Sequence, residues 1–296
     1  MEEKVITVDQ ERPQQLYEYS ARFAADHDSS FIPGRDFAIS DQTPSYLLVS
    51  SGEVVGAVSL MRTENFLKVN KARFSIFHTV LGTKEAYASL LDAIKPHMED
   101  LQSVYLFIPE KNTETAGIWK TLGFQVERYS FILQKGRPRL PNPIFPEGIR
   151  VFPLQPDDLE GIQWFADCIN EEFKDLAGHT PSSAEYIQTF FEDQGYIEGG
   201  LCLLKNGSEP IGTIGLMHDV DDRSAGEIMA FGILENYRGQ ALGRNLLRYG
   251  FNFLIERGLE PVILSVNGEN HGAIRLYESE GFQVTESVVC YNMIPG

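Results

Sequence analysis

The chain has 296 residues, of which 43% are hydrophobic and 23% charged, a composition typical of a folded protein with room for two domains. Its formal net charge of −17 argues against binding to nucleic acid or to an anionic membrane, because both require basic surface. Residues 1–148 hold 16 Lys and Arg against 19 Asp and Glu, whereas residues 149–296 hold 9 against 23. This acidic second half suits either a cationic acceptor or simple solubility.

Membrane and metal signals are weak in this chain. No apolar run approaches the roughly 20 residues that cross a bilayer, and the first residues lack the apolar core of a signal peptide. Cys168, Cys202 and Cys290 are too few and too scattered for a disulfide framework or a zinc site, and His218 and His271 are isolated. We therefore expect a cytoplasmic protein without a metal, whose cysteines are small core residues.

The first half is predicted to combine strands and helices. Its expected elements are, in order, a hairpin at 52–56, a strand at 72–80, a short turn at 81–83, a helix at 84–97 and a strand at 103–108.

A stiff linker follows over residues 135–148, KGRPRLPNPIFPEG. Its four prolines cannot continue a helix or a central strand, so the segment is expected to be extended. We therefore predict domains at 1–134 and 149–296, joined by 135–148.

The second half repeats features of the first. Asn112, Trp119 and Gly123 recur 158 residues later as Asn270, Tyr277 and Gly281. A preceding strand repeats with them, and so does the upstream hairpin, so a duplicated domain is the economical interpretation.

The second half also predicts a mixed sheet with helices on both faces. The expected strands are 149–153, 201–205, 210–217, 227–234, 262–266 and a final stretch over 282–293, and the expected helices are 156–173, 182–193, 242–257 and 270–280.

A glycine-bearing turn over 238–243 joins an apolar strand directly to a helix. The start of a helix carries partial positive charge and free backbone N–H groups, so this turn is suited to holding phosphate. Arg238, Arg244 and Arg248 lie close to it in the sequence, although Arg248 is more simply a surface residue.

This segment resembles the acetyl-coenzyme A signature of the GNAT superfamily of N-acetyltransferases, with Arg238 and Gly243 in place and Ala241 where the family usually has glycine. The second signature of the superfamily also matches, through Asn270, Tyr277 and Gly281-Phe282. The resemblance covers about 149–296 and, more weakly, the first half. It implies an α/β fold of two tandem domains, each a mostly antiparallel mixed sheet flanked by helices.

The resemblance implies transfer of acetyl from acetyl-CoA to a primary amine by direct attack. Tyr277 then matches the general acid that protonates the leaving thiolate, and a phenol suits this role because its pKa exceeds that of a thiol. Glu227 stands where some members carry a carboxylate base, while others use an ordered water. The implied cofactor-binding residues are Phe231, Gly232, Ile233, Arg238, Gly239, Gln240, Ala241, Leu242, Gly243, Arg244 and Asn270.

The first half lacks these chemical groups. Trp119 replaces the phenol, and the turn at 81–83 has no arginine and no second glycine. We therefore expect a degenerate copy, which either shapes the acceptor site or serves as a scaffold. A non-catalytic acyl-CoA-binding or regulatory protein is the alternative for the whole chain, and the acceptor and the oligomeric state stay open. The loops at 170–179 and 194–200 are expected to line the acceptor pocket.

Overall fold

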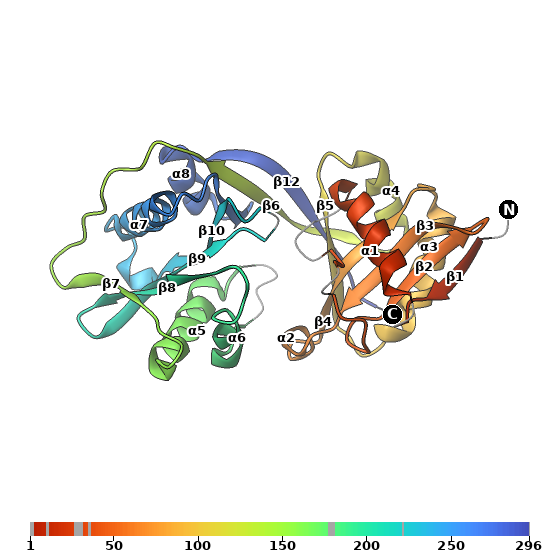
Figure 1. Cartoon of the computed structure of the whole chain (residues 1–296), viewed down its shortest axis with the longest axis horizontal. Coiled ribbons are helices and arrows are strands. Elements are labelled where there is room, and N and C mark those ends of the chain that lie inside the picture. The colour runs from red at the N-terminus through yellow and green to blue at the C-terminus, as the bar shows by residue number, and fades with distance from the viewer. Residues whose placement is uncertain are drawn as a thin grey trace. The chain divides into compact units, whose positions relative to one another are not determined.

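The computed structural model describes residues 3–9, 12–26, 32–34, 37–176, 181–220 and 222–295, apart from the side chain of Asn65. The chain forms two compact units (Figure 1). Unit 1 comprises Met1–Ser130 with Ser287–Gly296, and unit 2 comprises Phe131–Glu286. The last ten residues thus belong to unit 1, although they follow unit 2 in the sequence.

In unit 1 the sheet order is β1-β2-β3-β4-β5-β12. The neighbouring strands are antiparallel except for the parallel pair β4 and β5. The elements begun in this half of the chain are β1 (Glu3–Thr7), α1 (Pro13–Arg22), η1 (Ala24–Asp26), β2 (Ser45–Ser50), β3 (Glu53–Met61), α2 (Glu64–Leu67), β4 (Lys71–Thr79), α3 (Lys84–Ile94), η3 (Lys95–His97), β5 (Ser103–Pro109), α4 (Thr113–Thr121) and β6 (Gln125–Lys135).

In unit 2 the order is β6-β11-β10-β9-β8-β7, and β10 and β11 form its parallel pair. Each unit therefore takes its last strand from the other half of the chain. The remaining elements are β7 (Ile149–Pro153), α5 (Leu159–Phe173), α6 (Ala184–Thr189), β8 (Tyr196–Asn206), β9 (Glu209–His218), β10 (Gly226–Ile233), η4 (Glu235–Tyr237), α7 (Leu242–Glu256), β11 (Val262–Asn267), α8 (His271–Ser279) and β12 (Gln283–Met293).

The mixed sheet predicted from the sequence is confirmed, and helices cover both of its faces in unit 2. On one face α7 buries Leu242, Leu246 and Phe251 against the sheet. On the other face α5 buries Ile162, Phe165 and neighbouring residues in a separate core with α6. The two apolar stripes follow from the helical spacing of these side chains. They fix the helix ends beside the centre of the sheet.

The proline-rich segment 136–148 contains neither helix nor strand, as predicted. It is nevertheless fastened along α7 by asparagine side chains. Asn252 receives the N–H of Leu140 at 2.9 Å and donates to its carbonyl at 3.0 Å, and Asn245 receives the N–H of Ile144 at 2.9 Å. These bonds satisfy backbone groups that an extended segment leaves without partners, so the segment is part of unit 2 and not a free tether.

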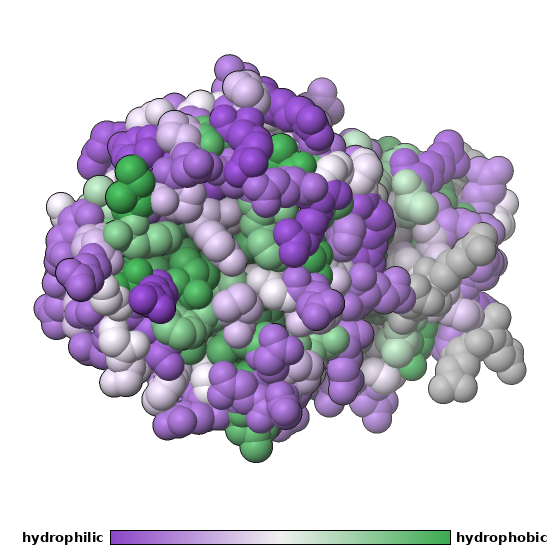
Figure 2. Space-filling view, turned by 60° about the vertical axis from the view of Figure 1, so that its left-hand side comes forward, coloured by the Kyte–Doolittle hydropathy of each residue, from purple (hydrophilic) through white to green (hydrophobic). Residues whose placement is uncertain are grey.

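The surface carries scattered apolar side chains, including the exposed Ile144, Leu159 and Val220. Figure 2 shows hydrophobic surface in separate patches among hydrophilic residues. Across the described ranges, no helix is both long enough and apolar enough to span a bilayer.

Candidate active site

The candidate site begins where β10 leaves its parallel neighbour. β10 keeps register with β11 only over Gly226–Ile228. On its other side, the ladder with β9 is broken by a bulge between Met229 and Gly232, and Ala230 there has a φ of 46°. A bulge releases backbone groups from the ladder. The end of β10 therefore presents its backbone to the gap between the separating strands.

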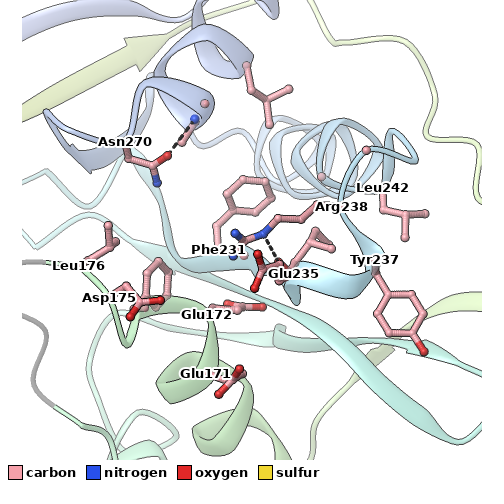
Figure 3. A pocket seen from close by; sticks show the side chains of 18 of the residues that line it. Glu171, Glu172, Asp175, Leu176, Phe231, Glu235, Tyr237, Arg238, Leu242 and Asn270 are labelled. Carbon is pink, nitrogen blue, oxygen red and sulfur yellow. Dashed lines mark hydrogen bonds between the residues drawn. The ribbon is translucent and has the colours of Figure 1, made fainter.

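A cavity of about 800 Å³ opens at this gap. Its walls come from the end of α5, the end of β10, the turn before α7 and the start of α8 (Figure 3). Most of the residues predicted from the sequence line it, namely Phe231, Gly232, Ile233, Arg238, Gly239, Ala241, Leu242, Gly243, Arg244, Asn270 and Tyr277. Glu227 and Gln240 lie outside this lining.

The N-terminus of α7 points its first turn at the cavity without a side-chain cap. Its N-cap is Ala241, which has a φ of 57° and has no side-chain group that could accept a hydrogen bond from the first turn. A Cβ at Gly243 would lie 3.7 Å from the nearest protein atoms, so packing within the protein leaves room for an alanine there. Uncapped N–H groups and open space at a helix start fit the phosphates of a nucleotide cofactor.

Three arginines near this turn have different partners. Arg238 donates from Nε to the Ile233 carbonyl at 2.8 Å, which holds its guanidinium across the end of β10. Arg248 and Arg244 both bind Glu280, whose side chain is buried. Arg248 thus has a structural partner and stands outside the cavity lining, while Arg238 and Arg244 are the cationic groups from this turn that face it.

Asn270 caps α8 at the opposite wall. Its Oδ1 accepts the N–H of Ala273 at 3.1 Å (Figure 3). An N-cap of this kind fixes where the helix starts. It therefore also fixes the position of Tyr277, two turns further along the same helix.

Tyr277 lines the cavity and is only 5% exposed. Its ring centroid is 5.9 Å from that of Phe231 and 6.1 Å from that of Phe282. Burial raises the pKa of the phenol above its ordinary value of 10. The hydroxyl is thus held in its protonated form, which is the form that a proton donor needs.

Glu227 is the second residue of β10 and pairs in register with Met217 on β9 and Ile263 on β11. It lies on the strand before the bulge, whereas the cavity begins after it. If Glu227 is the base, it therefore has to act from outside the cavity lining.

Glu172 is a site residue that was not predicted from the sequence. It lies in the last turn of α5 and lines the cavity. Its Oε2 accepts a hydrogen bond from Thr213 Oγ1 at 3.1 Å, while its Oε1 is buried and has no hydrogen-bond partner in the structure. Burial raises the pKa of this carboxyl to about 8, although hydrogen bonds from Thr213 and the charge of Arg238 act in the lowering direction.

Gly232 makes room for this carboxyl. A Cβ at that position would lie 2.1 Å from Glu172 Oε2, so a larger residue would displace the carboxyl from its present place. A sequence signal for Glu172 did exist, because it continues the buried stripe of Ile162, Phe165 and Ile169 at helical spacing. A charged residue on the apolar face of a helix marks a group with a local partner or a function.

Other predicted features lie elsewhere. Cys168, Cys202 and Cys290 are buried free thiols. Within the part of the chain that the structure describes, no group of three or more His, Cys, Asp or Glu residues could hold a metal. The predicted acceptor loop 170–179 is described only as far as residue 176, and residues 177–179 lie outside the described part.

Residues 163–282 match the model of the Acetyltransferase (GNAT) family. A mycothiol acetyltransferase of Thermobifida fusca is 40% identical over 75 residues, which are 25% of this chain and 23% of the relative. Matches to other proteins of that name span from 22% to 56% of their lengths, so the chain aligns with about half of these relatives at most.

Two solved structures share the fold over nearly all of both chains. A GCN5-related N-acetyltransferase from Sphaerobacter thermophilus has a TM-score of 0.74 at 17% identity and covers 99% of this chain and 95% of its own. A tandem GNAT protein from the clavulanic acid biosynthesis pathway has a TM-score of 0.73 at 15% identity, with 100% and 99% covered. The C-terminal half therefore contains the region that matches the GNAT family model, and the whole chain shares the fold of these two structures.

Proposed function

We propose that this chain is a tandem acetyltransferase of the GNAT family and that it transfers an acetyl group from acetyl-CoA to a primary amine in the cavity of unit 2. One observation carries the proposal. A bulged, separated strand end and an uncapped helix N-terminus meet at a single cavity of about 800 Å³ that also holds Tyr277. The first two features suit a phosphate-bearing thioester, and the third supplies an acid.

The residues present fit this cofactor. N–H groups in the first turn of α7, beside Arg238, would hold the pyrophosphate. The end of β10 would pair its backbone with the pantetheine arm, because the bulge leaves Ala230 and Phe231 outside the register with β9. Gln240 belongs to the same turn and is proposed to contribute its backbone only.

Acetyl transfer requires an N–H group for the thioester oxygen, an acid and a base. A backbone N–H near Ile233 would stabilise the negative charge on the thioester oxygen as the amine attacks. Tyr277 would give its proton to the departing sulfur. A base must receive the proton that the amine loses, and Glu227, acting through water, is the group that the family resemblance offers.

The acceptor is proposed only as a class of compounds, the primary amines. Relatives are named mycothiol acetyltransferases, so the amine that such enzymes acetylate belongs among the compounds tested. Alkylamines, diamines, amino sugars and amino acid amides complete the panel, because unit 2 presents both carboxylates and apolar groups to the cavity.

Tyr277→Phe tests the proposal. We expect kcat for amine-dependent thiol release to fall by about 10²–10⁴-fold, the usual worth of a general acid, while the Kd for acetyl-CoA from calorimetry stays unchanged. Tyr186→Phe is the matched control, since that tyrosine is 39% exposed on α6 and away from the cavity lining. Wild-type turnover in Tyr277→Phe would remove the assigned acid. Binding of acetyl-CoA without turnover of any amine by the wild type would favour the non-catalytic acyl-CoA-binding alternative.

A further inference from the structure

We propose that Glu172 receives the ammonium group of the acceptor and takes its first proton, so that the true substrates are amines that arrive as cations. This inference rests on the proposed acetyl transfer and deepens it by naming the acceptor subsite. It differs from the base suggested by resemblance, because Glu172 comes from α5 and Glu227 comes from β10.

The first observation is an incomplete hydrogen-bond shell. Oε1 of Glu172 is buried and has no hydrogen-bond partner, on a residue that lines the cavity. Buried carboxylate oxygens are normally paired, since losing hydration without replacement is unfavourable. An ammonium N–H arriving from the cavity would supply the missing donor. The carboxyl also touches Gly232, next to the stretch of β10 that would face the thioester.

The second observation is a hydroxyl that can serve both protonation states of Glu172. Thr213 Oγ1 lies 2.8 Å from the Ala230 carbonyl and 3.1 Å from Glu172 Oε2, yet it has one proton. With Glu172 ionised, the hydroxyl can donate to the carboxylate. With Glu172 protonated, the carboxyl can donate to Oγ1 while the hydroxyl donates to Ala230. The site therefore holds a proton without rearranging its heavy atoms.

The charges around this end of the cavity favour a cation. Glu171, Asp175 and Glu235 lie on the same side as Glu172 (Figure 3). Lys174 is paired with Glu171 at 2.6 Å, and Arg238, whose charge also acts on Glu172, donates to the Ile233 carbonyl at the end of β10. An acceptor with its own carboxylate beside the amine would meet these like charges and bind less well.

The acceptor R–NH3+ gives one proton to Glu172, and the free amine forms the N–C bond to the acetyl carbonyl. The C–S bond breaks, the sulfur leaves with its electron pair and takes the proton of Tyr277. The second proton of the nitrogen restores the phenol, and Glu172 later releases its proton to water. The products are the amide, free thiol and one proton.

Glu172→Gln tests the assignment, with Glu160→Gln as the control at the exposed first turn of the same helix. With an alkylamine acceptor, we expect kcat/KM to fall at least 100-fold in Glu172→Gln and to stay within twofold in Glu160→Gln. The Kd for acetyl-CoA should be unchanged in both. Glu172→Asp should recover part of the activity, which a purely structural role would not require.

The pH profile separates the two carboxylates. Arg238 and Cys168 interact electrostatically with Glu172, and the other titratable groups that line the same cavity are Glu171, Lys174, Asp175, Glu235, Arg244, Glu269, Tyr237 and Tyr277. Wild-type kcat/KM should rise with pH until about 8, where Glu172 is ionised, and this limb should disappear in Glu172→Gln but persist in Glu227→Gln. A limb lost in Glu227→Gln and kept in Glu172→Gln would overturn the assignment.

The acceptor class has its own test, in which L-amino acid amides are compared with the matching free amino acids. We expect the amides to show at least a tenfold higher kcat/KM, because they lack the carboxylate. Equal use of the free acids would overturn the cationic subsite while leaving acetyl transfer intact. A chain that neither binds acetyl-CoA nor releases thiol would instead contradict the proposed function itself.

Discussion

The two units contain the same parallel strand pair and use it in opposite ways. β4 and β5 keep register over three residues from Lys71 to Arg73, just as β10 and β11 do over Gly226–Ile228. Beyond that point unit 2 opens a cavity of about 800 Å³, whereas the matching place in unit 1 holds about 10 Å³. The same fold therefore does not by itself provide the site.

In unit 1 the side chain of Trp119, the counterpart of Tyr277, fills the space beyond the parallel strand pair. Its ring is 1% exposed and packs at 4.8 to 5.7 Å, centroid to centroid, from Phe77, Tyr87 and Phe124. An indole packed into an aromatic cluster occupies space and offers no acid comparable to a phenol. Unit 2 instead places a smaller ring at this position and leaves the gap open.

The helix that follows the strand pair differs as well. In unit 1 the Thr83 side chain caps α3 by accepting the N–H of Ala86 at 3.3 Å. In unit 2 Ala241 leaves the first turn of α7 uncapped. A cap satisfies the N–H groups that would otherwise bind an anion. Unit 1 thus differs from the candidate active site of unit 2 in a packing residue and in a capping residue, in addition to the missing arginine of its turn.

Trp119→Ala asks how much the filled gap stabilises unit 1. We expect the free energy of unfolding to fall by about 3–5 kcal/mol, because a large buried ring is replaced by a cavity. Acetyl-CoA affinity should not change, since the capped α3 still lacks a phosphate site. Denaturant unfolding and calorimetry measure the two quantities. A second acetyl-CoA site in this variant would show that Trp119 alone had blocked unit 1.

Glu172→Gln tests whether the buried carboxyl of Glu172 destabilises the folded chain. The pKa of Glu172 is raised from 4.5 to about 8 in the fold, so the folded chain holds this proton to higher pH than the unfolded chain does. The free energy of unfolding of the wild type should therefore fall by on the order of 3 kcal/mol as pH rises from about 5 to 8. The variant, which has no carboxyl at this position, should not show this loss. Unfolding curves at both pH values measure it, and an equal pH dependence in both proteins would contradict the raised pKa.

Arg238→Ala tests the phosphate side of the cavity. Because the variant loses a charge-assisted contact, its affinity for acetyl-CoA should be about 10- to 100-fold lower. Arg150→Ala, an exposed change on β7, is the control and should bind normally. Equal affinity in Arg238→Ala, measured by calorimetry, would argue against a role for this arginine in holding phosphate.

Ala241→Gly is expected to have the smallest effect. Ala241 adopts the left-handed conformation, with φ 57° and ψ 11°, which costs an alanine about 1 kcal/mol more than a glycine. Glycine also gains freedom in the unfolded chain, so the net stabilisation should be about 0.5 kcal/mol. Thermal unfolding would detect it, and a clear destabilisation would indicate that the alanine methyl makes a needed contact.

Much of unit 2 follows from local sequence. The strand, turn and helix around 227–257 were predicted because apolar periodicity and glycine punctuation act over short distances, and Tyr277 and Asn270 were singled out by their resemblance to the second GNAT signature. The destination of β6 and β12 was not predicted. Strand partners are chosen by contacts between distant residues, and nothing within a strand records its neighbour.

Glu172 shows the same limit within the site. Its position on the buried stripe of α5 was visible, but its function depends on Gly232 and Thr213, which lie 60 and 41 residues away in the sequence. The filled gap in unit 1 was anticipated only as a missing phenol. That Trp119 also closes the space depends on three aromatic partners from separate elements.

The most direct test of the account is the number and place of acetyl-CoA sites on the full chain, measured by isothermal titration calorimetry. Gly243→Glu puts a negative side chain at the start of α7, where the protein leaves room for a Cβ, and Lys84→Glu makes the corresponding change at the exposed start of α3. We predict one site per chain, lost in Gly243→Glu and unchanged in Lys84→Glu. Two sites, or a site lost only in Lys84→Glu, would contradict the assignment of the active site to unit 2.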